Sequence, residues 1–129
     1  MDYIVCKEEN RSYFEKIGEY NYCSLEKMLL PNMIAIDTES DGLLARKNDT
    51  FCVQLGTGSN NYIIVLYNNN YTFQELIPYL ENKILVFHNA LFDLGFFYKY
   101  GFYPKEVRDT LLASRIIYNG DVENIKHDF

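Results

Sequence analysis

The sequence lacks long hydrophobic runs, cysteine pairs and an excess of basic residues. No apolar segment approaches the roughly 18 residues that a membrane-spanning helix requires. The first ten residues are acidic and short of apolar side chains, unlike a signal peptide. The three cysteines, Cys6, Cys23 and Cys52, form no Cys-x-x-Cys motif, which disfavours a thiolate metal site and fits a reducing compartment. We therefore expect a cytoplasmic protein with no membrane partner.

The charge balance limits the kind of partner. With 12 basic and 18 acidic residues the net charge is −6, which disfavours a general polyanion binder because such binding depends on Lys and Arg. An enzyme that holds nucleic acid through metal ions remains compatible with this charge. The abundance of Asn, Tyr, Ile, Lys and Phe, which have AT-rich codons, suggests a low-GC bacterium or its phage.

Composition and periodicity predict one α/β domain over residues 1–129, with 48% hydrophobic residues available for a core. Apolar runs predict a mixed five-stranded sheet with flanking helices. The expected strands are 33–37, 50–58, 61–67, 83–88 and 105–109. The expected helices are 11–20, 72–82, 90–101 and 110–120, with a short helical turn in 24–30 and a short strand in 2–6. Local signals define two helix ends, a capping box at Thr72 and Glu75 and a terminating Gly101.

Two carboxylates follow the apolar strand that begins at Met33. Side chains alternate along a strand, so Asp37 and Glu39 share one face, roughly 6 to 7 Å apart. Two like charges so placed raise each other's pKa unless a cation joins them. On this motif alone, a solvated strand end that opens a loop is the simpler interpretation.

Asp93 strengthens the alternative of a metal site. It lies among apolar residues of a predicted helix, where a charge is costly unless it is paired, although the helix dipole also stabilises a carboxylate in the first turn. The strand before this helix should run parallel to strand 33–37, so that their carboxyl ends meet at one edge of the sheet. Three converging carboxylates suit Mg²⁺ or Mn²⁺, and paired divalent ions suit attack on a phosphodiester.

Three segments in register resemble the DEDD superfamily of 3′–5′ exonucleases. They are IDTE at 36–39, HNALFD at 88–93 and RDTLLASRII at 108–117. The closest resemblance is to the proofreading exonuclease domain of family A, DNA polymerase I-like, polymerases, with the RNase D group as nearest neighbour. The resemblance implies a ribonuclease H-like fold whose five strands have the spatial order 3-2-1-4-5.

The family motifs imply roles for individual residues. Asp37 and Glu39 match the Asp-x-Glu motif, and Asp93 ends the Asn-x-x-(Phe/Tyr)-Asp motif; these three would hold two Mg²⁺ or Mn²⁺ ions and form the catalytic set. The residues that would contact the terminal nucleotide are Leu43, Asn89 and Phe92. The implied partner is the single-stranded 3′ end of DNA, together with the remainder of a DNA polymerase.

The resemblance stops before the third motif of the family, Tyr-x-x-x-Asp or His-x-x-x-Asp. Tyr118 and Asp121 are one residue too close together, and His127 and Asp128 are adjacent. We therefore expect a partial exonuclease domain without its last helices, in which the second metal site is incomplete. Weak or absent nuclease activity of this chain alone follows from that expectation.

Two other functions stay open at this point. The chain could be a non-catalytic fragment that binds nucleic acid or docks on the rest of a split polymerase, or it could be an RNase D-like ribonuclease. Two polar residues near the motifs also have structural interpretations. Asp109 is expected to be the N-cap of the last helix rather than a metal ligand, and His88 a core or supporting histidine rather than a base.

Overall fold

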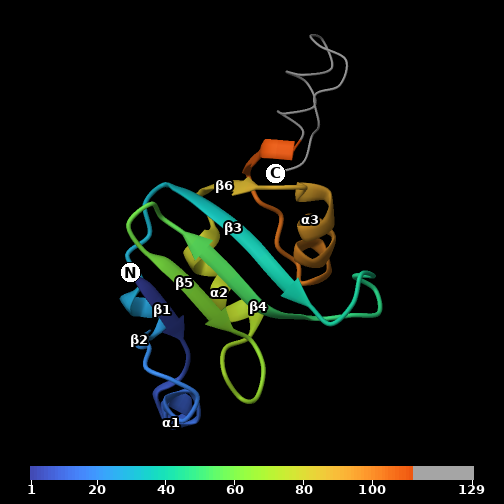
Figure 1. Cartoon of the computed structure of the whole chain (residues 1–129). Helices are drawn as coiled ribbons and strands as arrows, with labels where there is room; N and C mark the ends of the chain where they lie inside the picture. Colours follow the sequence, from blue (N-terminus) through green and yellow to red (C-terminus); the bar gives the residue numbers. More distant parts are fainter. Residues whose placement is uncertain (112–129) are drawn as a thin grey trace, which may run out of the picture.

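Strands from both halves of the chain form one mixed sheet in the computed structural model, which describes residues 1–111 (Figure 1). Within these residues the strands are β1 (Asp2–Val5), β2 (Asn21–Cys23), β3 (Met33–Ser40), β4 (Thr50–Gly56), β5 (Asn61–Val65), β6 (Ile84–Phe87) and β7 (Glu106–Asp109). Their spatial order is β2-β1-β5-β4-β3-β6-β7. The β3–β4 and β4–β5 pairs are antiparallel, and the other neighbouring pairs are parallel.

The predicted strand order is confirmed, whereas the predicted strand count is wrong. The five expected strands are β5, β4, β3, β6 and β7, which lie in the order 3-2-1-4-5. The sheet of the described chain has seven strands because β1 pairs parallel with β5, and β2 pairs parallel with β1. The three residues of β2 are too few to show a periodic pattern, and their pairing depends on an element that lies far away in sequence.

The described helices are α1 (Arg11–Glu15), α2 (Phe73–Leu80) and α3 (Ala90–Lys99), with 3₁₀ turns η1 (Glu8–Asn10) and η2 (Leu25–Lys27). α1 is shorter than predicted. The capping box is present: the Glu75 N–H donates to Thr72 Oγ1 at 3.2 Å, and the Thr72 N–H donates to Glu75 Oε1 at 3.0 Å. Gly101 follows α3 with a φ of +82°, as the terminating glycine requires. The predicted helix 110–120 lies outside the described residues from 112 onward.

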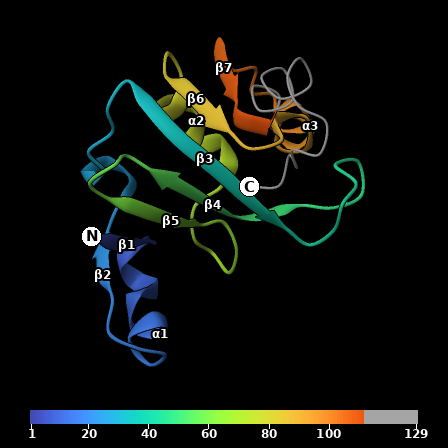
Figure 2. The same cartoon turned by 45° about the horizontal axis from the view of Figure 1, so that its top comes forward.

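The two faces of the sheet are covered differently. One face packs against α2 and α3 and forms the main core, whose members include Ile34, Ile36, Val53, Leu55, Ile64, Leu76, Leu85, Phe87 and Phe97. On the other face, Phe14 of α1 forms a small second cluster with Ile4, Cys6 and Val65 at the β1–β5 edge. Farther along that face, β3 and β4 expose Asp37 and Gln54, which lie opposite each other in the register. No helix of the part of the chain that the structure describes covers this region of the sheet, which we call the open face (Figures 1 and 2). Within residues 1–111, no helix combines the length and hydrophobicity needed to cross a bilayer.

Removal of the capping box should destabilise the fold measurably. Thr72→Ala deletes the hydroxyl that accepts the Glu75 N–H, and we expect the free energy of unfolding to fall by about 1 kcal/mol in urea denaturation. Gln74→Ala changes an exposed residue of the same helix and should have little effect. Equal stability of the two variants would contradict the assigned cap.

Candidate functional site

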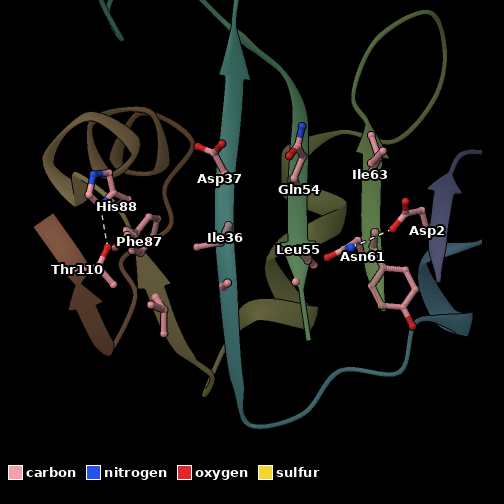
Figure 3. Close-up of a pocket in the computed structure, with 14 residues that line it drawn as sticks. Asp2, Ile36, Asp37, Gln54, Leu55, Asn61, Ile63, Phe87, His88 and Thr110 are labelled. Carbon is pink, nitrogen blue, oxygen red and sulfur yellow. Dashed lines mark hydrogen bonds between the residues drawn. The ribbon is translucent and has the colours of Figure 1, made fainter. Parts of the chain in front are cut away.

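The carboxyl ends of β3 and β6 lie side by side. These strands are parallel, and Ala35 pairs with Val86. Continuing both strands therefore carries Asp37 towards the turn that begins α3. Alternation places Asp37 and Glu39 on the exposed side of β3, while Thr38 between them is buried. Figure 3 shows Asp37 on the open face beside Gln54, with His88 just after the end of the neighbouring strand β6.

Asp93 lies on the buried side of the same strand end. Only 3% of the residue is exposed, and Thr38 Oγ1 donates a hydrogen bond to Asp93 Oδ1. Burial raises the pKa of Asp93 to about 6; the charges of Asp37 and Asp109 act in the same direction, and the bond from Thr38 acts against them. Sequence patterns identified the cost of burying Asp93 but missed the role of Thr38, whose only signal was its position between Asp37 and Glu39.

The expected convergence of three carboxylates is not found. Within residues 1–111, no group of three or more His, Cys, Asp or Glu side chains lies close enough to hold a metal ion. The physical reason is strand alternation: Thr38 holds Asp93 towards the buried face, whereas Asp37 and Glu39 stand on the exposed face. The metal-binding roles of the three residues stay a prediction.

The donor chemistry of this strand end nevertheless fits a divalent cation. The charge of Asp37 raises the pKa of Asp93, so the two carboxylates interact unfavourably when both are ionised. A cation relieves such repulsion, and oxygen ligands alone suit Mg²⁺ or Mn²⁺. The chemistry of Asp37 and Asp93 therefore suits a divalent ion, and Glu39 shares the face of Asp37.

The turn between β6 and α3 is held by the end of β7. Asn89 adopts a left-handed conformation with φ of +71°. Asp109 accepts the N–H groups of Asn89 at 3.0 Å and of Ala90 at 2.9 Å. It also accepts the Leu111 N–H at 3.0 Å, the bond expected of an N-cap residue.

His88 lies on the surface and is not a core residue, which corrects that part of the prediction. Its Nδ1 lies 2.8 Å from Thr110 Oγ1, and the Thr110 hydroxyl donates to the Phe87 carbonyl at 3.1 Å. This pairing orients the imidazole at the margin of the open face.

The residues expected to contact a terminal nucleotide lie on different elements. Leu43 is in the β3–β4 loop and is 81% exposed. Asn89 is exposed, and Phe92 is half-buried, with its ring 5.4 Å from that of Phe96 in an edge contact. Sequence reasoning missed Leu91, which is 83% exposed in the first turn of α3. An exposed leucine there offers apolar surface at the start of α3.

A hollow of about 720 Å³ lies over the open face (Figure 3). Its described lining includes Asp37, Gln54, Ile63, His88 and Thr110. Its lining combines apolar residues of the sheet with polar side chains, which suits a ligand with both kinds of surface. The hollow thus connects the strand end bearing Asp37 with the His88–Thr110 pair.

Comparison with known proteins identifies the family. A family model described as 3′–5′ exonuclease matches residues 2–123. The chain belongs to the 3′–5′ exonuclease family. DNA polymerase I of Aquifex aeolicus (strain VF5) is 34% identical over 82 residues, which are 64% of this chain and 13% of that polymerase. The predicted resemblance to the exonuclease domain of DNA polymerase I is therefore confirmed.

Solved structures share the fold of this exonuclease-family chain. Brucella melitensis NrnC with bound Mg²⁺ is 19% identical, with a TM-score of 0.64 over 99% of this chain and 56% of that chain. Escherichia coli RNase D, an exoribonuclease involved in structured RNA processing, is 19% identical, with a TM-score of 0.56 over 88% of this chain and 29% of that chain. These similarities confirm the ribonuclease H-like α/β fold. This chain spans between 13% and 56% of the length of these three proteins.

The pKa of Asp93 predicts how stability of this exonuclease-family chain depends on pH. Since the folded-state pKa of about 6 exceeds the ordinary value near 4, the folded chain binds the proton more tightly. The resulting stabilisation is complete below about pH 4 and is lost as pH rises through 6. Asp93→Asn should therefore raise the free energy of unfolding at pH 7.5 by about 2 kcal/mol in metal-free buffer.

Urea denaturation between pH 4 and pH 7.5 measures this effect. The profile of Asp93→Asn should be flatter than that of the wild type. The exposed Glu19→Gln should leave the profile unchanged. Identical profiles for Asp93→Asn and the wild type would show that ionisation of Asp93 does not destabilise the folded chain.

Proposed function

We propose that this chain forms the part of a metal-dependent 3′–5′ exonuclease site that removes 3′-terminal nucleotides from DNA, as in the proofreading part of a DNA polymerase. The observation that carries the proposal is the position of the exposed Asp37 and the buried Asp93 at the end of β3, in a chain of the exonuclease family. The Mg²⁺ bound to the NrnC relative supports the choice of cation.

In this proposal Asp37, Glu39 and Asp93 hold Mg²⁺ or Mn²⁺ in a two-metal arrangement whose second site is incomplete. A divalent ion held there would polarise the terminal phosphodiester and lower the pKa of a bound water. The Thr38 hydroxyl fixes the orientation of the Asp93 carboxylate through their hydrogen bond. Asp37 and Glu39 remain accessible on the exposed side of the strand.

Side chains around this strand end contact the terminal nucleotide. Leu43 presents an exposed apolar surface from the β3–β4 loop and packs against the terminal base. Asn89 and Phe92 shape the pocket from the start of α3. Stacking and apolar contact are tolerant of base identity, so we expect the site to trim ends of any sequence.

The identity to DNA polymerase I favours DNA as the substrate, while the fold of RNase D makes RNA the alternative. A second candidate function is a non-catalytic module that docks on the rest of a split polymerase. The exposed Met33 and the partly exposed Ile63 of the open face favour docking, because apolar sheet surface is normally covered. The ribonuclease and the docking module predict different outcomes of the same digestion experiment.

Digestion of 3′-labelled single-stranded DNA and RNA of the same sequence, with Mn²⁺, tests the proposal. We expect weak trimming of DNA that falls more than about 100-fold in Asp37→Ala, since even changes to residues that only support a metal ligand cost 10- to 100-fold. Glu19→Ala removes an exposed carboxylate and should retain the wild-type rate.

The other outcomes favour an alternative function or contradict the assigned site. Trimming of RNA alone, lost in Asp37→Ala, would indicate a ribonuclease. Trimming that survives in Asp37→Ala would contradict the assigned site. No trimming by the wild type would indicate that these residues alone do not form a working site, which is the outcome that the docking module predicts.

A further inference from the structure

Asp109 at the end of β7 bonds to the turn before α3. Both carboxylate oxygens of Asp109 are used: Oδ1 accepts the Asn89 and Leu111 N–H groups, each at 3.0 Å, and Oδ2 accepts the Ala90 N–H at 2.9 Å. Asp109 lies 20 residues after Asn89, so these bonds join two segments that are distant in the sequence.

Thr110 extends the same contact by two residues. Its hydroxyl donates to the Phe87 carbonyl at 3.1 Å and lies 2.8 Å from His88 Nδ1. The two side chains of Asp109 and Thr110, which we call the Asp109–Thr110 clamp, therefore bond to every residue from 87 to 90. Figure 3 shows the bond between His88 and Thr110 at the rim of the hollow.

The turn needs such support. Asn89 has a φ of +71°, a conformation that costs a residue other than glycine about 1 kcal/mol. Its side chain makes no capping bond to α3, so the first N–H groups of the helix need acceptors from another element. The Asp109 carboxylate supplies them with charge-assisted bonds, which are stronger than neutral ones.

The position of the turn decides the position of Asp93. This residue lies in the first turn of α3, one helical turn beyond the Ala90 N–H that Asp109 binds. Its carboxylate must meet Thr38 of β3, whereas the clamp lies at the end of β7, on the far side of β6. A shift of the turn relative to the sheet would therefore move Asp93 away from Thr38 and Asp37.

We propose that Asp109 is a positioning residue for the nuclease site: its bonds to the Asn89 and Ala90 amides hold the start of α3 so that Asp93 lies at the end of β3. The inference rests on the proposed function for the statement that Asp93 binds metal. Asp109 itself contacts neither substrate nor metal in this assignment.

Two variants of Asp109 and two control variants test the proposal. Asp109→Ala removes all the acceptor atoms, and Asp109→Asn keeps one carbonyl oxygen and so preserves part of the clamp. Glu106→Ala is the matched control, since Glu106 is an exposed acid on the same strand whose carboxylate pairs with Arg108 at 3.0 Å. Asp37→Ala serves as the control for the metal site.

Two measurements are made on each variant: hydrogen exchange of the Asn89 and Ala90 amides, and Mn²⁺ affinity by titration calorimetry. In Asp109→Ala we expect exchange at both amides to accelerate at least about tenfold and Mn²⁺ affinity to fall about 10- to 100-fold. Asp109→Asn should be intermediate in both, and Glu106→Ala should equal the wild type. If Asp109→Ala does not fold, the intermediate values of Asp109→Asn decide the question.

Other results would overturn the inference in distinguishable ways. Unchanged exchange would show that the clamp does not hold the turn. Faster exchange with unchanged Mn²⁺ affinity, while Asp37→Ala loses affinity, would reduce Asp109 to a purely structural role. If Asp37→Ala binds Mn²⁺ as well as the wild type, or the wild type binds none, the proposed function fails and the positioning role fails with it.

Discussion

The hydrogen bond between the Thr38 hydroxyl and the buried Asp93 carboxylate links the two halves of the candidate site. A carboxylate that is 3% exposed is costly to ionise, and burial raises its pKa to about 6. Asp93 is nevertheless buried where the carboxyl ends of the parallel strands β3 and β6 meet. Both α3 and β3 contribute acidic residues at this point. A cation bound there would make ionisation of Asp93 less unfavourable. The Thr38–Asp93 hydrogen bond therefore connects the fold with the proposed chemistry.

Much of the fold could be predicted because its signals are local. The capping box of Thr72 and Glu75, the terminating Gly101 and the apolar runs of β3 and β6 each lie within a few consecutive residues. β2 could not be predicted, because three residues acquire a structure only by pairing with β1. The order of the other strands depended on the family resemblance, and the similarity to solved exonuclease structures confirms the fold.

The site was predicted less completely because its geometry depends on contacts between distant segments. Spacing alone placed Asp37 and Glu39 on one face of β3, as observed. It did not reveal that Thr38 would hold Asp93 towards the opposite face, or that Asp109 would bond back to Asn89. Each of these contacts crosses from one element to another, so a pattern within either element carries no signal for it. The expected cluster of three carboxylates assumed a convergence that the described residues do not make.

The central claim is that the end of β3 and the start of α3 form one cation site. Paramagnetic broadening of amide NMR signals by Mn²⁺, added in small amounts to the ¹⁵N-labelled chain, tests it most directly. The account predicts that the signals of residues 37–39 and 89–93 disappear first and together. Selective loss of signals elsewhere, such as the loop that contains Asp41 and Asp49, with these two segments unaffected, would contradict it.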